Sequence, residues 1–144
     1  MLARLHSHNG ANVVAKIGDL GSAAVCASPD VRVFEEIGSS GYTAPEVFQP
    51  SGYDARADVW SLGVVLWELL VDSRERNPFV GRAGDDVLRL VHEGVRPSCA
   101  DAPAPLVALL QACWLVDPSQ RPTAHEVAQA LQAIARSHHS LESC

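Results

Sequence analysis

The sequence predicts a mainly α-helical fold, and three observations support this prediction. Residues 57–71 (ADVWSLGVVLWELLV) are apolar on every side, which is typical of a helix buried at the centre of a domain. Three later segments, at residues 84–94, 106–116 and 123–136, also have the pattern of helices. Only residues 11–17 resemble a strand, so the chain has too few strands for a sheet that could cover these helices.

The composition is that of one globular domain or a large part of one. The chain has 144 residues, of which 47% are hydrophobic and 19% charged, enough to bury a core. A net charge of −6 with scattered basic residues argues against a nucleic-acid partner. No stretch approaches the roughly 18 apolar residues of a membrane span, and the N-terminus lacks the apolar region of a signal peptide. Four cysteines without a C-x-x-C pair indicate neither a zinc site nor a disulfide framework, so we expect a cytoplasmic protein.

Residues 15–23 (AKIGDLGSA) place an aspartate between an apolar stretch and a glycine. The segment before it, residues 11–17, is short, apolar and β-branched, as strands are. Taken alone, Asp-x-Gly is more often a tight turn than a metal-binding carboxylate at the end of a strand. Residues 18–54 then lack clear periodicity, which is unusual for so long a segment in a compact domain and more often indicates function or mobility.

The helix predicted at residues 57–71 has one apolar face, while bulky apolar residues also fill its other faces. That face is formed by Val59, Leu62, Leu66, Leu69 and Leu70. About 15 residues are too few to span a membrane, so we expect a central buried helix. Asp58 lies in its first turn, where a carboxylate interacts favourably with the positive end of the helix dipole.

The remaining helices have recognisable ends. A polar loop at residues 72–83 precedes the helix at 84–94, for which Asp85 is a candidate cap and Gly94 a stop. The helix at 106–116 is expected to end at Asp117-Pro118.

The last helix is predicted to open with the capping box Thr123-Ala-His-Glu126, in which the two side chains satisfy each other's backbone N–H groups. It is expected to stop near Arg136, leaving residues 137–144 as a frayed tail.

Four separated motifs occur in one order along the chain: Asp19-Leu20-Gly21, GSSGYTAPE at 38–46, DVWSLGVVLWEL at 58–69 and CWLVDPSQRP at 113–122. Together they resemble the C-terminal lobe of a eukaryotic protein kinase, in the tyrosine-kinase-like serine/threonine group. The resemblance covers residues 11–136 and implies a short β-hairpin, a long activation segment and helices around one buried helix. In the family an apolar strand leads to D-F-G, so residues 2–17 are expected to form the hairpin, turning at Asn9-Gly10.

The resemblance assigns a metal role to the first motif. Asp19 takes the position of the D-F-G aspartate, which binds Mg²⁺ at the ATP phosphates, with Gly21 beside it in the cofactor site. Leu20 replaces the family's Phe and is expected to fill the same apolar pocket. ATP and Mg²⁺ are therefore the cofactors of the complete domain, and a protein is its substrate.

The 27-residue step from Asp19 to Glu46 corresponds to the activation segment. Its hydroxyl groups near the end are those of Ser39, Ser40, Tyr42 and Thr43. GSSGYTAPE is more similar to the G-T-x-x-Y-x-A-P-E of serine/threonine kinases than to the corresponding tyrosine-kinase motif. The resemblance therefore favours serine/threonine specificity.

Three further positions have structural roles in the family. Glu46 and Arg121, each expected on its own to be a solvated charge, correspond to a salt bridge that pins the activation segment to the helices. Asp58 corresponds to a buried carboxylate that accepts hydrogen bonds from the H-R-D catalytic loop. Trp114 belongs to the W-x-x-D-P-x-x-R-P motif.

The 144 residues contain no H-R-D, no Gly-rich loop and no lysine in a V-A-I-K context, so the N-terminal lobe and the catalytic aspartate are absent from this sequence. We therefore expect residues 1–136 to be a partial kinase domain, with Met1 an internal methionine of a longer kinase. The chain on its own is expected to bind neither ATP nor Mg²⁺ tightly and to transfer no phosphate. Two alternatives stay open: a fragment of an active kinase, or a non-catalytic, pseudokinase-like interaction module.

Overall fold

A computed structural model describes residues 16–25, 28, 31–71, 77–100 and 102–142, with side chains described as far as residue 137. The described chain is mainly helical, as predicted. Its four α-helices and three short 3₁₀ helices are α1 (Arg56–Leu70), α2 (Gly84–His92), α3 (Ala104–Cys113) and α4 (Ala124–Glu142), with η1 (Leu20–Ser22), η2 (Pro45–Phe48) and η3 (Pro118–Gln120).

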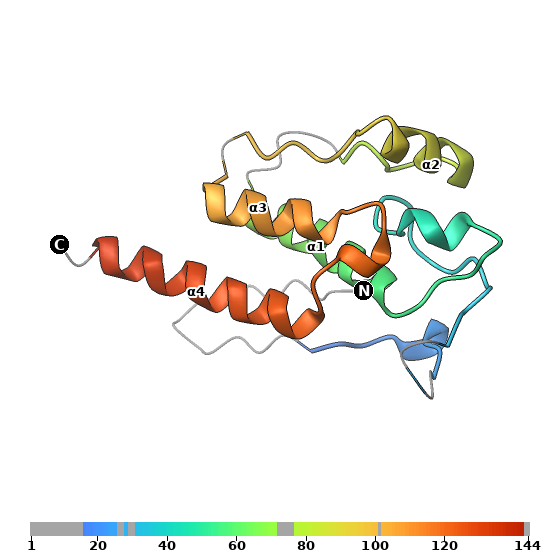
Figure 1. Ribbon diagram of the computed structural model, residues 1–144, viewed down its shortest axis with the longest axis horizontal. Coiled ribbons are helices and arrows are strands. Elements are labelled where there is room, and N and C mark those ends of the chain that lie inside the picture. The colour runs from blue at the N-terminus through green and yellow to red at the C-terminus, as the bar shows by residue number, and fades with distance from the viewer. Residues whose placement is uncertain (1–15, 26–27, 29–30, 72–76, 101, 143–144) are drawn as a thin grey trace.

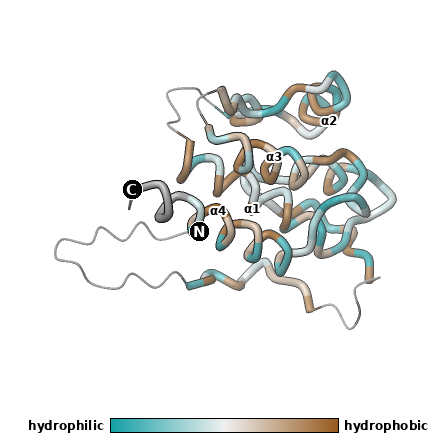
Figure 2. Tube along the Cα trace, turned by 60° about the vertical axis from the view of Figure 1, so that its left-hand side comes forward, coloured by the Kyte–Doolittle hydropathy of each residue, from teal (hydrophilic) through white to brown (hydrophobic). Residues whose placement is uncertain are grey.

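The helices surround α1. Figure 1 shows α3 lying along α1, α4 beside them, and α2 set apart at the opposite edge, where it packs against η2. The segment that precedes α1 runs along the outside of this group. In Figure 2 the α2 tube alternates between hydrophobic and hydrophilic colours, as expected for a helix with one face on the core.

α1 supplies the centre of the core. Trp60 and Val64 are fully buried and Trp67 nearly so, and the Trp67 indole N–H donates a hydrogen bond of 2.6 Å to the Ser98 carbonyl. The guanidinium carbons of Arg96 and Arg121 lie 5.3 and 5.2 Å from the Trp60 ring centroid. Trp60 therefore combines apolar burial with two cation–π contacts.

Two helices differ from their predicted bounds. α3 begins at Ala104, because Pro105 fits the first turn of a helix, and it ends at Cys113, three residues before the predicted end. Leu115 and Val116 lie beyond it, 41% and 40% exposed, so their apolar character did not indicate helix. Asp117 instead caps η3 by accepting a hydrogen bond of 2.9 Å from the Ser119 N–H.

α2 and α4 also correct the predictions at their ends. Asp85 is not the cap of α2: the N-cap is Ala83, without a side-chain hydrogen bond, and Asp85 lies in the first turn. Gly94 follows α2 with φ +84°, a conformation that suits glycine and ends the helix where predicted. α4 does not stop near Arg136, since it continues to Glu142.

The predicted hairpin at residues 2–17 lies almost entirely outside the described residues. Lys16 and Ile17, its last two residues, have no regular secondary structure and are exposed. Within the described ranges, the β structure consists of one antiparallel bridge between Val33 and Tyr53. The described helices include none with the length and apolar character needed to cross a membrane.

Candidate functional site

The Asp19-Leu20-Gly21 motif lies on an exposed loop. Asp19 precedes η1 with φ 61° and ψ 58°, a left-handed conformation that Asp adopts more readily than most residues. A Cβ on Gly21 would have the Asp19 carboxylate, 4.0 Å away, as its nearest neighbour. Across the described part of the chain, no group of three His, Cys, Asp or Glu side chains could hold a metal ion. This loop therefore offers one carboxylate, not a complete metal site.

Leu20 does not fill an apolar pocket, as the resemblance implied. Its side chain is 66% exposed, and Ile17 and Val25 nearby are 92% and 98% exposed. The reason is that no described element packs over this part of the chain.

Glu46 and Arg121 form the ion pair that the resemblance implied. The Arg121 Nη1 and Nη2 donate to the two carboxylate oxygens of Glu46 at 2.6 and 2.8 Å, with side-chain exposures of 0% and 8%. Arg121 also donates from Nε to the Leu115 carbonyl at 2.9 Å and from Nη1 to the Arg56 carbonyl at 3.0 Å. One guanidinium thus connects η2, the start of α1 and the loop after α3.

Asp58 is exposed in the first turn of α1, so the prediction that it is buried is wrong for this chain. Partial desolvation by the surrounding protein still raises the pKa of Asp58 above its usual range.

Trp114 is 1% exposed and follows the last residue of α3. Beside it, burial raises the pKa of the Cys113 thiol to about 11, so this thiol is inert at neutral pH.

The hydroxyl groups of GSSGYTAPE have different neighbours. The Tyr42 hydroxyl donates to the Glu68 carboxylate at 2.7 Å, and this bond raises the pKa of Tyr42. The Thr43 hydroxyl donates to the Ser39 carbonyl at 3.0 Å, while Ser40 Oγ accepts from the Gly81 N–H at 2.7 Å. These bonds fix the segment against α1 and against the turn before α2.

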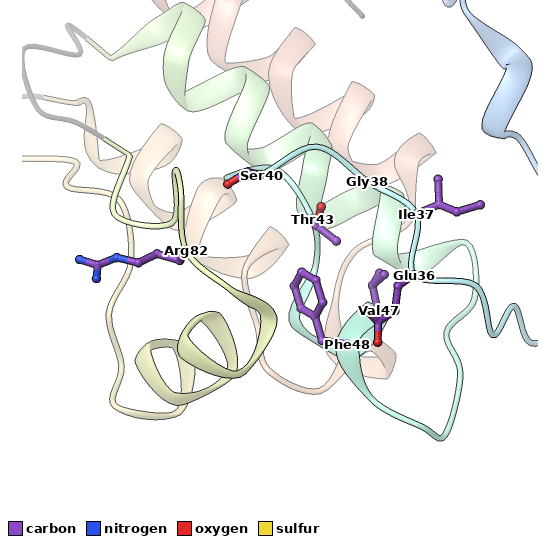
Figure 3. A pocket seen from close by; sticks show the side chains of 8 residues that line it. All are labelled: Glu36, Ile37, Gly38, Ser40, Thr43, Val47, Phe48 and Arg82. Atoms are coloured by element: carbon purple, nitrogen blue, oxygen red, sulfur yellow. The ribbon is translucent and has the colours of Figure 1, made fainter.

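A cavity of about 180 Å³ lies beside this segment. Figure 3 shows the Phe48 ring below Thr43, and the Arg82 side chain extending away from the other labelled residues. The lining residues come from the segment, from η2 and from the turn before α2: Glu36, Ile37, Gly38, Ser40, Thr43, Val47, Phe48 and Arg82. A cavity of this size holds a group about as large as a benzene ring.

Sequence reasoning did not predict the role of Asn77, which lies outside the segment and holds it in place. Asn77 is buried and donates to the Gly41 carbonyl at 2.9 Å, while its Oδ1 accepts from the Phe79 N–H at 3.0 Å. It lies 36 residues from Gly41, so no local pattern connects them. A polar residue followed by Pro-Phe in a loop gave no signal of its own.

Comparisons with known proteins identify the family. Residues 6–131 match the family of protein tyrosine and serine/threonine kinases. Human mitogen-activated protein kinase kinase kinase 7 is 35% identical over 126 residues, covering 85% of this chain and 20% of that protein. Chicken ephrin type-A receptor 7 is 31% identical, covering 92% and 14% of the two chains. A probable LIM domain-containing serine/threonine-protein kinase of Dictyostelium discoideum is 35% identical, covering 70% and 15%.

The chain belongs to the protein tyrosine and serine/threonine kinase family, because the match covers most of its length. It spans about a fifth or less of the length of these relatives. The mainly helical architecture is that of the C-terminal lobe expected from the four motifs.

Proposed function

We propose that this chain is the C-terminal lobe of a kinase that transfers the γ-phosphoryl group of ATP to serine or threonine residues of protein substrates. The observation that carries the proposal is the buried Glu46–Arg121 pair. It joins two motifs that are 75 residues apart and fixes the end of the activation segment to the helical core. If Glu46 and Arg121 were ordinary surface charges, their side chains would be exposed to solvent and not buried.

Asp19 is the residue that would hold Mg²⁺. Its exposed carboxylate fits this role, because protein Mg²⁺ sites use one or two carboxylates and complete the shell with water and phosphate oxygens. Bound there, Mg²⁺ would supply positive charge against the phosphates of ATP. Gly21 lies beside the Asp19 carboxylate, since a Cβ there would be 4.0 Å from it. Because its sequence has no Gly-rich loop and no lysine in a V-A-I-K context to hold the phosphates, the 144-residue chain alone should bind neither Mg²⁺ nor ATP tightly.

The cavity beside Thr43 is the proposed contact for the protein substrate. It is formed by the last part of the activation segment, and its lining combines the Phe48 ring and the Thr43 methyl group with the polar groups of Glu36 and Ser40. Serine/threonine specificity is supported by the GSSGYTAPE motif and by the Dictyostelium relative, which is named a serine/threonine-protein kinase. The free thiols of Cys99 and Cys113 favour a reducing, cytoplasmic location.

The isolated chain should not transfer phosphate, because its sequence has no H-R-D aspartate to accept the proton of the substrate hydroxyl. In this state it would act as a non-catalytic interaction module, for which the folded helical core is sufficient. An assay of the purified chain with radiolabelled ATP tests this: turnover that disappears in Asp19→Asn would contradict it.

Grafting tests the activity itself. Residues 16–136 would replace the matching part of the kinase domain of mitogen-activated protein kinase kinase kinase 7. We expect the chimera to phosphorylate a general protein substrate on serine and threonine, as read by phosphoamino-acid analysis. Asp19→Asn should abolish this, while Asp85→Asn on the exposed first turn of α2 should not. Phosphotyrosine alone, or no activity from a folded chimera, would refute the proposal.

A further inference from the structure

The activation segment changes character at Arg32. Every described residue from Lys16 to Arg32 is exposed, including Val25, which is 98% exposed. From Val33 onward the segment makes contacts with the turn that precedes α1. The first residues to be held are therefore 32–35, immediately before the cavity wall begins at Glu36.

Residues 52–54 make these contacts, and we call them the clasp. Val33 and Tyr53 exchange two backbone hydrogen bonds, of 2.8 Å from the Val33 N–H and 2.9 Å from the Tyr53 N–H. The Tyr53 hydroxyl donates a third, of 2.9 Å, to the Glu35 carbonyl. Tyr53 itself packs against the hydrophobic core, so the bridge ties the segment to the folded helices.

Gly52 lets the clasp approach the segment closely. Its φ of +71° is a conformation that glycine adopts readily. A Cβ at this position would meet the Val33 carbonyl at 2.8 Å and the Phe34 ring at 2.9 Å. Both distances are too short for real contacts, so the clasp can close only over a glycine.

Asp54 adds a charged contact. Its carboxylate is 5% exposed and accepts hydrogen bonds from the Arg56 N–H at 2.9 Å and from Arg56 Nη1 at 3.0 Å. Arg32 reaches the same carboxylate from the segment at 3.6 Å. Arg56, at the start of α1 and with a side chain that is 45% exposed, thus orients the carboxylate, and Arg32 connects the segment to it.

We propose that Gly52, Tyr53 and Asp54 are positioning residues: they hold residues 32–35 so that Glu36, Ile37 and Gly38 form one wall of the cavity. Glu36 follows the last clasped residue directly, so little slack lies between the clasp and the wall. When the clasp opens, hydrogen bonds of Ser39 and Ser40 still hold the wall from its far side. The consequence for substrate binding rests on the proposed function; the positioning itself does not.

Replacing Gly52 by Ala tests the proposal, with Gly94→Ala as the matched control. Both glycines have φ in the left-handed region, +71° and +84°, but a Cβ on Gly94 meets nothing within 4 Å. Both variants therefore carry the same kind of backbone strain, and only Gly52→Ala pushes against the segment. Hydrogen exchange of the Val33 amide, resolved by NMR on the full chain, measures the clasp directly.

In Gly52→Ala we expect the Val33 amide to exchange on the order of tenfold faster than in Gly94→Ala, the effect of losing about one hydrogen bond. The amide signals of Ile37 and Gly38 should shift in the same variant, while protection within α1 stays as in the control. Equal Val33 exchange in the two variants, or loss of protection spread over α1, would overturn the proposal.

Arg32→Ala and Arg56→Ala give a second test that needs no substitution at a glycine. Both arginines contact Asp54, but only Arg32 belongs to the segment. Arg32→Ala should shift the amide signals of Ile37 and Gly38 without lowering the melting temperature. Arg56→Ala should lower the melting temperature and shift these amide signals less. Unchanged signals in Arg32→Ala would contradict the role of Asp54. Neither test requires phosphate transfer, so an inactive chain does not affect the outcome.

Discussion

Arg121 shows how one side chain connects parts of the chain that are distant in sequence. Its guanidinium makes two hydrogen bonds to Glu46 and one each to the carbonyls of Leu115 and Arg56, and it lies over the Trp60 ring. Arginine suits this position because its planar donors are fixed in direction and it stacks on aromatic rings. A buried pair of this kind costs desolvation, so its benefit lies in fixing geometry as well as in stability.

Replacing Arg121 by Lys should therefore be strongly destabilising. Lysine keeps the charge but cannot donate in all these directions, which leaves the Glu46 carboxylate buried without its bidentate partner. We expect a loss of about 3 kcal/mol in the free energy of unfolding, measured by urea denaturation. Arg89→Lys is the control, because Arg89 pairs with Glu93 at 2.9 Å on an exposed face of α2. Similar midpoints for the two variants would show that the Arg121 network is not formed in solution.

The sequence predicted some helix ends correctly and others wrongly. The capping box of α4 is present: Thr123 Oγ1 accepts from the Glu126 N–H at 3.2 Å, and Glu126 Oε2 accepts from the Thr123 N–H at 2.7 Å. This motif is predictable because both partners are local. α3 ended early because Leu115 and Val116, though apolar, face solvent, which only the tertiary packing decides.

The capping box should make the stability of α4 depend on pH. Hydrogen bonds from the Thr123 N–H and hydroxyl lower the pKa of Glu126 below its ordinary value of 4.5. Because the folded-state pKa is depressed, the carboxylate stabilises the fold above about pH 4.5, and this contribution is lost as pH falls through the lower folded value.

Glu126→Gln removes the charge and keeps a hydrogen-bond acceptor at the same position. We expect its melting temperature to be below that of the parent chain at pH 7, with the difference closing as pH falls through the depressed folded-state pKa of Glu126. Thr123→Ala should instead cost about 1 kcal/mol at neutral pH, because it removes the cap itself. A Glu126→Gln difference that stays constant between pH 7 and 3 would contradict the assignment.

Across the whole molecule, sequence reasoning succeeded where apolar patterning or several separated motifs indicated the same structure. The helical class and the central α1 followed from the apolar patterning, and the Glu46–Arg121 pair followed from the order of four motifs. The clasp and the cavity did not, because Arg32 and Asp54, or Ser40 and Gly81, meet through tertiary folding and belong to no local pattern. The burial of Leu20 and Asp58 was wrongly predicted for a related reason. Their partners in the family would belong to parts of a kinase domain that these 144 residues do not contain.

The approach of α1 to α3 holds the helical core together, and Gly63 determines how close it is. A Cβ at this position would meet Cys113 Cβ and Trp114 Nε1, both at 2.8 Å. Alanine favours an α-helix over glycine by about 1 kcal/mol, which opposes the cost of the overlap. Forcing a methyl group into a packed core costs about 1–3 kcal/mol, and here both neighbours are fully or nearly fully buried.

We therefore expect Gly63→Ala to destabilise the chain, by up to about 2 kcal/mol, despite its better helix propensity, as the net of these two effects. Chemical denaturation followed by tryptophan fluorescence measures this, since Trp60, Trp67 and Trp114 all lie in the affected core. Gly18→Ala is the control, because a Cβ there meets nothing within 4 Å and its φ is not in the left-handed region. If Gly63→Ala were as stable as Gly18→Ala, α1 and α3 would have to lie further apart than the structure places them.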